Sequence, residues 1–174
     1  MSLVAVIPSR GDDELCLGQT YILSILNTNE VLTAINHEDL KLSRFENSRR
    51  QMWRLDPCVE NRHTFANVET GHCLGASRTH GYFCCKWDDF GPAEQFTFIP
   101  RKTGGYHVYN HLGDRPRLVT RQGNEDFLRT AATGNAFVTI GVHCAENTAL
   151  QASESNMLLQ ASEPLGGRRA AGFQ

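Results

Sequence analysis

The chain has 174 residues and a mass of 19.4 kDa, which suits a single domain with a core of its own. Its 17 basic and 19 acidic residues give a formal net charge of -2, which argues against nucleic acid or an anionic membrane as a partner. No stretch approaches the roughly 18 consecutive apolar residues that a membrane-spanning helix needs.

The first segment, residues 1–17, contains a short apolar run, Leu3 to Ile7. The run lacks a basic region before it and ends at Pro8, so it is a poor signal peptide. Without a secretion signal, we expect reduced thiols in a cytoplasmic protein and no disulfide framework. The six cysteines are Cys16, Cys58, Cys73, Cys84, Cys85 and Cys144.

Three successive units of the chain show the same order of short alternating runs. In the first unit the predicted strands are YILSILN (21–27), VLTAIN (31–36), LKLSRF (40–45) and a run that opens at Trp53. In the second they are FANVE (65–69), HCLGAS (72–77), YFCCKW (82–87) and a run from Phe96. In the third they are YHVYN (106–110), RLVTRQ (117–122), DFLRTA (126–131) and a run from Phe137. Period-2 alternation and turn-rich links favour an antiparallel all-β domain.

The spacing of aromatic residues supports a repeat. Each unit has a triplet of a polar residue, any residue and an aromatic residue: QMW (51–53), EQF (94–96) and NAF (135–137). The aromatics at 53, 96 and 137 are 43 and 41 residues apart. A unit this small cannot bury its own core, so the repeat predicts twelve strands in a closed structure of pseudo-threefold symmetry, which also removes exposed sheet edges.

The segment GHCLGASRTHGYFCCKWDDFGPAEQFTF (71–98) resembles the ricin-B-type β-trefoil lectin family. The resemblance covers about residues 18–144 and implies a β-trefoil of three four-strand repeats, about 18–58, 61–101 and 104–144. Residues 1–17 and 145–174 then form extensions. It also implies a lectin-like carbohydrate-binding module, with at most one shallow sugar pocket in each repeat.

The chain departs from the family at the aspartate that normally follows Cys-Leu and accepts bonds from two sugar hydroxyls. The corresponding residues are Thr33, Gly75 and Val119. A neutral side chain makes weaker hydrogen bonds than a carboxylate. This departure puts galactose binding of the family's type in doubt in every repeat and leaves the scaffold unaffected.

The second repeat keeps most of the remaining chemistry, so we expect a non-standard ligand site there. Trp87 matches the stacking position, Asp88 or Asp89 would accept hydrogen bonds, and Glu94 stands where the family has glutamine. His80 or Tyr82 would lie at the rim. The ligand would be a carbohydrate or another small molecule, and no cofactor is implied.

A structural role is the alternative interpretation of several of these residues. Trp87 would then be partly core, and Asp88 to Pro92 a polar turn. Gln51, Glu94 and Asn135 would hold turn backbone through side-chain hydrogen bonds. The aromatic residues that follow them are expected in the core: Trp53, Phe96 and Phe137.

No metal site is expected, because Cys84 and Cys85 should point to opposite faces of a strand and no Cys-x-x-Cys pair is present. Two other function classes stay open. One is a small enzyme of secondary metabolism, such as an isomerase, a cyclase or a hydrolase, although no nucleophile-elbow, P-loop or dinucleotide motif occurs and a binding module is favoured. The other is a protein-binding trefoil such as a protease inhibitor, acting through the loop HLGDRPRL (111–118).

The last segment, residues 145–174, contains LQAS twice and an apolar run, Met157-Leu158-Leu159. We expect this run to dock on the trefoil surface or on a second subunit, which would make the protein a homodimer.

Overall fold

A computed structural model describes residues 6–7, 10–57, 60–88, 90–131 and 137–148, which form twelve β-strands and two short 3-10 helices. The strands are β1 (Thr20–Ile25), β2 (Glu30–Ala34), β3 (Leu40–Arg44), β4 (Trp53–Asp56), β5 (Thr64–Asn67), β6 (Cys73–Ala76), β7 (Phe83–Trp87), β8 (Phe96–Pro100), β9 (Tyr106–Asn110), β10 (Arg117–Thr120), β11 (Arg129–Ala131) and β12 (Ile140–Cys144). The 3-10 helices are η1 (Arg49–Gln51) and η2 (Pro92–Glu94), and residues 145–148 after β12 are α-helical. Within the described residues, no helix has the length and apolar composition needed to cross a membrane.

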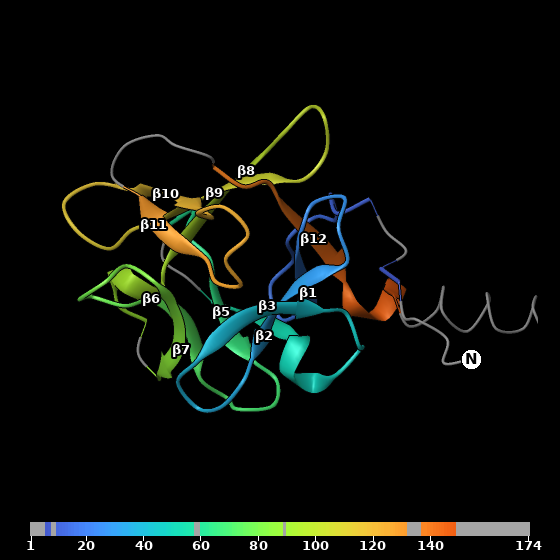
Figure 1. The fold of residues 1–174 in the computed structure, drawn as a ribbon, viewed down its shortest axis with the longest axis horizontal. Coiled ribbons are helices and arrows are strands. Elements are labelled where there is room, and N and C mark those ends of the chain that lie inside the picture. The colour runs from blue at the N-terminus through green and yellow to red at the C-terminus, as the bar shows by residue number, and fades with distance from the viewer. Residues whose placement is uncertain (1–5, 8–9, 58–59, 89, 132–136, 149–174) are drawn as a thin grey trace, which may run out of the picture.

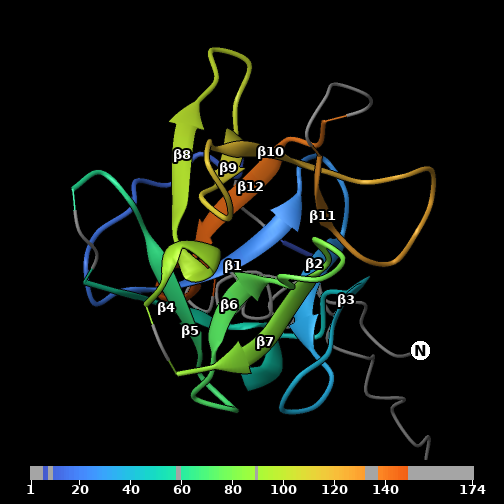
Figure 2. The ribbon, with the colours of Figure 1, turned by 90° about the vertical axis from the view of Figure 1, so that its left-hand side faces the viewer.

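Six of the strands close into a ring, and Figure 2, which turns the view of Figure 1 by 90°, labels each of them. Strand β1 pairs with β12 and β4, β4 pairs with β5, β8 pairs with β9, and β9 pairs with β12. The ring closes between β5 and β8 through a β-bridge of His63 with Phe96. Each backbone N–H donates to the carbonyl of the other residue, at 2.7 and 2.9 Å. Because every strand of the ring has two neighbours, the ring itself has no edge strand within the described residues.

The other six strands form three hairpins, β2–β3, β6–β7 and β10–β11, and each hairpin follows the first ring strand of its repeat (Figure 2). The hairpins also meet one another. Asp39 forms a bridge with Cys84, Tyr82 forms a bridge with Arg129, and the N–H of Leu42 donates to the carbonyl of Asp126. Twelve strands in three such repeats confirm the predicted all-β, pseudo-threefold architecture.

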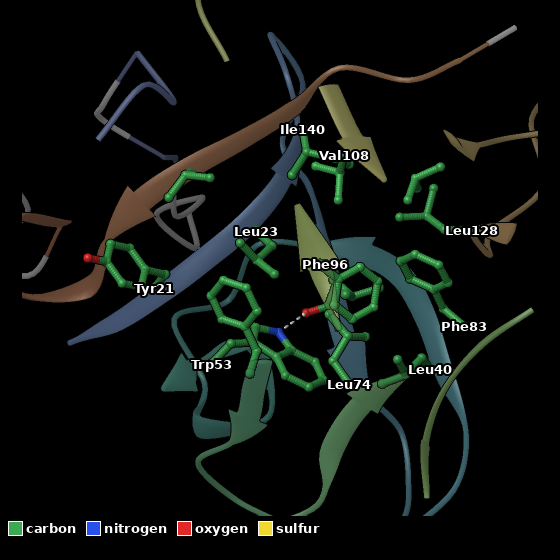
Figure 3. Packing of buried hydrophobic residues seen from close by; sticks show 14 of the residues in the cluster. Tyr21, Leu23, Leu40, Trp53, Leu74, Phe83, Phe96, Val108, Leu128 and Ile140 are labelled. Carbon is green, nitrogen blue, oxygen red and sulfur yellow. Dashed lines mark hydrogen bonds between the residues drawn. The ribbon is translucent and has the colours of Figure 1, made fainter. Parts of the chain in front are cut away.

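The core lies where the inward faces of the ring and the hairpins meet (Figure 3). Leu23, Phe96 and Val108 come from ring strands, whereas Phe83 and Leu128 come from the second and third hairpin regions. Trp53 is fully buried, and its indole Nε1–H donates to the carbonyl of Leu32 at 3.0 Å. A buried indole needs such an acceptor, so this bond links β4 to the first hairpin.

The third repeat differs from the prediction. Phe137 is 52% exposed, and its ring packs edge-on against His107, 4.8 Å between centroids, instead of lying in the core. The strand pairing explains the difference: Trp53 pairs with Tyr21 in the first repeat, and Ile140 pairs with Tyr106 in the third. Ile140, which is buried, therefore takes the place of Trp53, and the prediction of a core Phe137 is wrong by three residues.

In β10 of the same repeat, the residue that corresponds to the other two repeats lies one position later than the sequence alignment predicts. Val119 is fully buried in the core, as Leu32 and Leu74 are in the first two repeats. The residue after it, Thr120, therefore corresponds to Thr33 and Gly75, which follow the other two. The place where the family has aspartate is then occupied by threonine, glycine and threonine, so the predicted absence of the aspartate holds with Thr120 in place of Val119.

The segment before β1 is attached to the domain. The N–H of Val142 donates to the carbonyl of Gly11 at 2.8 Å, and the N–H of Cys144 donates to the Asp13 carboxylate at 2.7 Å. The hydroxyl of Tyr106 donates to the Asp13 carbonyl at 2.9 Å. Residues 11–13 of the predicted N-terminal extension thus run along β12. At the other end, the predicted docking run Met157-Leu158-Leu159 lies outside the described residues.

Candidate functional site

Two of the predicted site residues lie together in the β6–β7 hairpin. The rings of His80 and Tyr82 stack with centroids 6.1 Å apart and planes inclined by 17°. Tyr82 also meets the edge of Phe127 at 4.8 Å, and the guanidinium of Arg129 lies 4.9 Å from its ring centroid. Both His80 and Tyr82 are exposed, so the structure places them at the surface where the second repeat adjoins the third.

Asp88 lies at the other end of β7. Its carboxylate is exposed, and Oδ1 is 3.4 Å from Nδ1 of His72, which also lies 3.0 Å from the carbonyl oxygen of Lys86. Five residues of mostly extended chain lie between Tyr82 and Asp88, which puts the two up to roughly 20 Å apart. One monosaccharide cannot span that length, so the structure does not bring these two predicted residues into a single pocket.

Glu94 is fully buried at the end of η2. It lies beside Gly75: a Cβ added to that glycine would be 3.1 Å from Oε1 of Glu94 and 3.3 Å from the carbonyl of Ala93. Glu94 therefore occupies the space next to the position where the family has aspartate. Because Glu94 is fully buried, it lies beneath the surface, and its contact with a ligand stays a prediction. Two other predicted contacts, the side chain of Trp87 and the whole of Asp89, lie outside the described part of the chain.

Gln51 occupies the same place in the first repeat and has a structural role. Its Nε2 donates to the Arg44 carbonyl at 2.8 Å and to the hydroxyls of Thr33 and Ser43 at 3.2 and 3.3 Å. Its Oε1 accepts the N–H of Glu46 at 2.8 Å. These bonds satisfy a fully buried amide and hold the turn before β4, as the structural interpretation of Gln51 predicts. Asn135, the predicted counterpart in the third repeat, lies outside the described residues.

A pocket of about 490 Å³ lies between the turn of the first hairpin and the second hairpin. The two hairpins are held together by the bridge between Asp39 and Cys84 and by a bond from the Cys85 N–H to the Glu38 carbonyl at 2.9 Å. The lining comprises charged, hydroxyl and aromatic side chains: Glu38, Asp39, Ser77, Arg78, Thr79, Tyr82, Phe83, Cys84 and Lys86. The pocket thus combines one predicted residue, Tyr82, with polar groups from two repeats.

The acidic side of this pocket is held in shape by Asn36. Its Oδ1 accepts the N–H groups of Glu38 and Asp39 at 2.7 and 2.8 Å, and its Nδ2 donates to Asp39 Oδ2 at 2.8 Å. An asparagine that bonds backbone two and three residues ahead stabilises a tight turn. The two carboxylates are therefore presented by a fixed turn and not by a loose loop.

Charges in the pocket balance. Glu38 and Asp39 carry negative charge, and Arg78 and Lys86 carry positive charge, with Lys86 Nζ 3.2 Å from Glu38 Oε2. Burial raises the pKa of the half-buried Cys84 thiol, so the thiol is protonated at neutral pH and is a weak nucleophile. The lining can donate and accept hydrogen bonds without a net charge, which suits a neutral polar ligand.

The sequence pattern did not indicate Glu38, Asp39 or Arg78. It showed residues 36–39 only as a turn between two predicted strands, with nothing to say which part of another repeat the turn meets. Cys84 and Cys85 behave as predicted: Cys84 lines the pocket and Cys85 is buried in the core. In the part of the chain that the structure describes, no three His, Cys, Asp or Glu side chains gather in a way that could hold a metal ion.

The loop proposed for an inhibitor, 111–118, connects β9 to β10. Residues 113–117 are exposed, and the positive φ of Gly113 (97°) marks a tight bend close to the guanidinium of Arg117. The loop is accessible to a partner, but no other feature of the described residues around it points to protease binding.

No known family model matches the chain, and no curated protein matches it. Solved structures do. The chain is similar to a mosquitocidal holotoxin, at 14% identity and a TM-score of 0.63 over 75% of this chain and 18% of that chain. It is similar to ThreeFoil, a designed 3-fold symmetric protein, at 14% identity and 0.58 over 71% of this chain and 97% of that chain. It is also similar to 1,3Gal43A, an exo-β-1,3-galactanase from Clostridium thermocellum, at 15% identity and 0.59 over 72% of this chain and 30% of that chain.

At these identities the likeness concerns the fold. The match spans nearly all of the designed threefold protein but less than a third of the toxin and of the galactanase. Together with the closed six-stranded ring and the three hairpins, it establishes that the chain has the β-trefoil fold.

Proposed function

We propose that the protein is a lectin-like carbohydrate-binding module whose site is the pocket between the first and second hairpins. Two observations support a sugar ligand. The β-trefoil of this chain is similar to part of an exo-β-1,3-galactanase, an enzyme that acts on a carbohydrate. The pocket itself places an aromatic side chain, two carboxylates and two cationic groups around one space of about 490 Å³.

The chemistry of the pocket matches that of a sugar ring. Carboxylates accept hydrogen bonds from pairs of hydroxyls, as Glu38 and Asp39 can, and cationic groups donate to ring and hydroxyl oxygens, as Arg78 can. Tyr82 adds an aromatic side chain with a polar hydroxyl to the lining. Because the four charges sum to zero, a neutral hexose is favoured over an acidic or amino sugar.

The observation that carries the proposal is that Glu38 and Asp39 line the same pocket as Tyr82. The strand position of the family's aspartate has no carboxylate in any repeat, yet a neighbouring repeat supplies two carboxylates from a rigid turn. The acceptor chemistry that a lectin needs is thus present at a different place in the fold. The predicted contacts of Trp87, Asp88 and Asp89 at the far end of β7 stay a prediction, with His80 beside Tyr82 at the rim.

A glycan array with the full chain, followed by calorimetric titration of the strongest neutral ligand, tests the proposal. We expect binding to weaken about 10-fold or more in a Glu38→Gln, Asp39→Asn double variant, since each lost charged hydrogen bond contributes about 1.5–3 kcal/mol. Tyr82→Ala should weaken binding similarly. Asp88→Asn is the matched control, because it removes an exposed carboxylate of the second repeat that lies outside the pocket.

Two results would count against this site. Absence of binding to every glycan at high protein concentration would remove the lectin function. Loss of binding in the control, with retention in the Glu38 and Asp39 double variant, would move the site to the Asp88 end of β7. Cytoplasmic localisation and a homodimer formed through residues 145–174 stay predictions.

A further inference from the structure

A second pocket lies where the first and third repeats join. It has a volume of about 400 Å³ and shares no residue with the pocket described above. Its walls come from the N-terminal segment, the turn between β1 and β2, and one residue each of β1 and β12. The last two are Ser24 and His143, and they are the chemically distinctive feature of this pocket.

Ser24 and His143 are in direct contact. Oγ of Ser24 lies 2.7 Å from Nε2 of His143, and the two residues are only 2% and 3% exposed. In the β1–β12 ladder Ser24 pairs with Gly141, so His143, two residues further along β12, projects from the same face of the sheet. The strand register therefore fixes the two side chains against each other.

Glycine at position 141 is required for this contact. A Cβ there would collide with Oγ of Ser24 and would lie 2.8 Å from Nε2 of His143. Gly11, from the N-terminal segment, approaches on the same side, where an added Cβ would be 3.2 Å from Cε1 of His143. Two glycines thus leave room for a hydroxyl and an imidazole to meet at the edge of a pocket.

The imidazole is in the protonation state of a general base. Burial lowers the pKa of His143 to about 4, and the nearby carboxylates of Asp13 and Asp12 oppose that shift. At neutral pH the ring is uncharged, and in the tautomer that carries its proton on Nδ1 the Nε2 atom accepts the Ser24 hydroxyl proton. The two aspartates would stabilise the imidazolium that forms when the proton moves.

We propose that Ser24 is a nucleophile activated by His143, and that this pocket hydrolyses small carboxylic esters. Oγ of Ser24 attacks the carbonyl carbon while its proton passes to Nε2 of His143. The bond from that carbon to the leaving alcohol breaks, and the alcohol takes the proton from His143. Water then attacks the acyl-serine in the same way, releasing the carboxylic acid and restoring Ser24. Arg10, Asn27 and Asn29 line the pocket and supply donors for the carbonyl oxygen as it gains charge.

Labelling of the full chain with a fluorophosphonate probe, which reacts with activated serines, tests this proposal. We expect one adduct on the folded protein, located at Ser24 by peptide mass spectrometry, and no adduct after thermal unfolding. Mapping the wild-type adduct does not depend on the folding of any variant. Hydrolysis of p-nitrophenyl acetate should fall at least about 100-fold in Ser24→Ala and His143→Gln, each checked for its fold by circular dichroism.

Ser48→Ala is the matched control, since its hydroxyl lines neither pocket and makes no cap hydrogen bond to η1, so labelling and hydrolysis should stay unchanged. A folded wild-type protein that takes up no probe would overturn the proposal, and so would an adduct mapped to a different serine. Equal hydrolysis by the wild type and by folded Ser24→Ala would have the same meaning, because the pair would then serve only to join β1 and β12.

Discussion

The first and third repeats have the same backbone plan and fill it differently. In the first, Trp53 is fully buried and bonded to the carbonyl of Leu32, and Gln51 holds the turn before it. In the third, the corresponding core residue is Ile140, and the nearby aromatic, Phe137, lies at the surface against His107. Strand pairing is therefore retained where side-chain identity is not.

The difference shows that the sheet ladder, and not the aromatic residue, defines the position in each repeat. An aliphatic side chain can fill the place of an indole if neighbouring residues supply the remaining volume, because packing depends on total volume as well as on individual shapes. The same separation of scaffold from side chain applies to function. The family's aspartate position holds Thr33, Gly75 and Thr120, while the carboxylates of the proposed site come from a hairpin turn.

The strongest test of the comparison is truncation of the two equivalent core residues. Trp53→Ala should lower the free energy of unfolding by about 4 kcal/mol, because it leaves a large cavity and an unpaired carbonyl at Leu32. Ile140→Ala should cost about 2–3 kcal/mol. Urea denaturation of the two variants measures both values. A larger loss for Ile140→Ala than for Trp53→Ala would contradict the assignment of their roles.

Acidification should weaken the joint between the first and third repeats. The pKa of His143 is about 4 in the folded protein, against an ordinary value of 6.5. Below pH 6.5 the unfolded chain takes up a proton that the folded chain does not, so stability is full above pH 6.5 and falls as the pH drops toward 4. The loss reaches about 3 kcal/mol.

Urea denaturation between pH 7 and pH 4.5 measures this effect, with His143→Gln as the comparison. Because the substitution itself changes the starting stability, the relevant quantity is the slope of the unfolding free energy against pH. This slope should be shallower in the variant, which lacks the contribution of His143. Identical slopes in the two proteins would show that His143 is protonated alike in the folded and unfolded states.

Restoring the family's aspartate in the second repeat should harm the fold and not create a sugar site. In Gly75→Asp the new Cβ would lie 3.1–3.3 Å from Glu94 and Ala93, and a second carboxylate would enter a buried region beside Glu94. We expect a loss of about 2 kcal/mol in thermal or urea unfolding. Gly75→Ala adds the Cβ without the carboxylate, so its loss of stability measures the steric part of the effect alone. Improved glycan binding by a stable Gly75→Asp variant would show that the family's site is intact.

The smallest effect is expected at Phe137. Because its ring is 52% exposed, Phe137→Ala should lower the free energy of unfolding by less than about 1 kcal/mol, mainly through lost contact with His107. Differential scanning calorimetry would detect the change as a small shift in the unfolding temperature. A loss close to that of Trp53→Ala would place Phe137 in the core after all.

Much of the architecture could be predicted from the sequence. Alternating runs at a period of 41–43 residues indicated the strands, and Gln51 and Trp53 were assigned their structural roles correctly. The third repeat was misaligned because Phe137 kept the aromatic character of the motif while Ile140 took its position in the sheet. Similarly, Leu118 and Val119 are both apolar, and only the strand pairing shows which one faces the core.

Sequence by itself determined the secondary structure and the repeat organisation of this protein, with twelve strands in three repeats. It also determined that the family's aspartate is absent from every repeat. These properties follow from side-chain periodicity within short segments. Only the tertiary structure decided which segments meet. It brought Glu38 and Asp39 of the first repeat to Tyr82 of the second, and Ser24 of the first repeat to His143 of the third. Both pockets lie at joints between repeats, where ring closure and hairpin packing bring together residues 40 to 120 positions apart, and no local pattern carries that information.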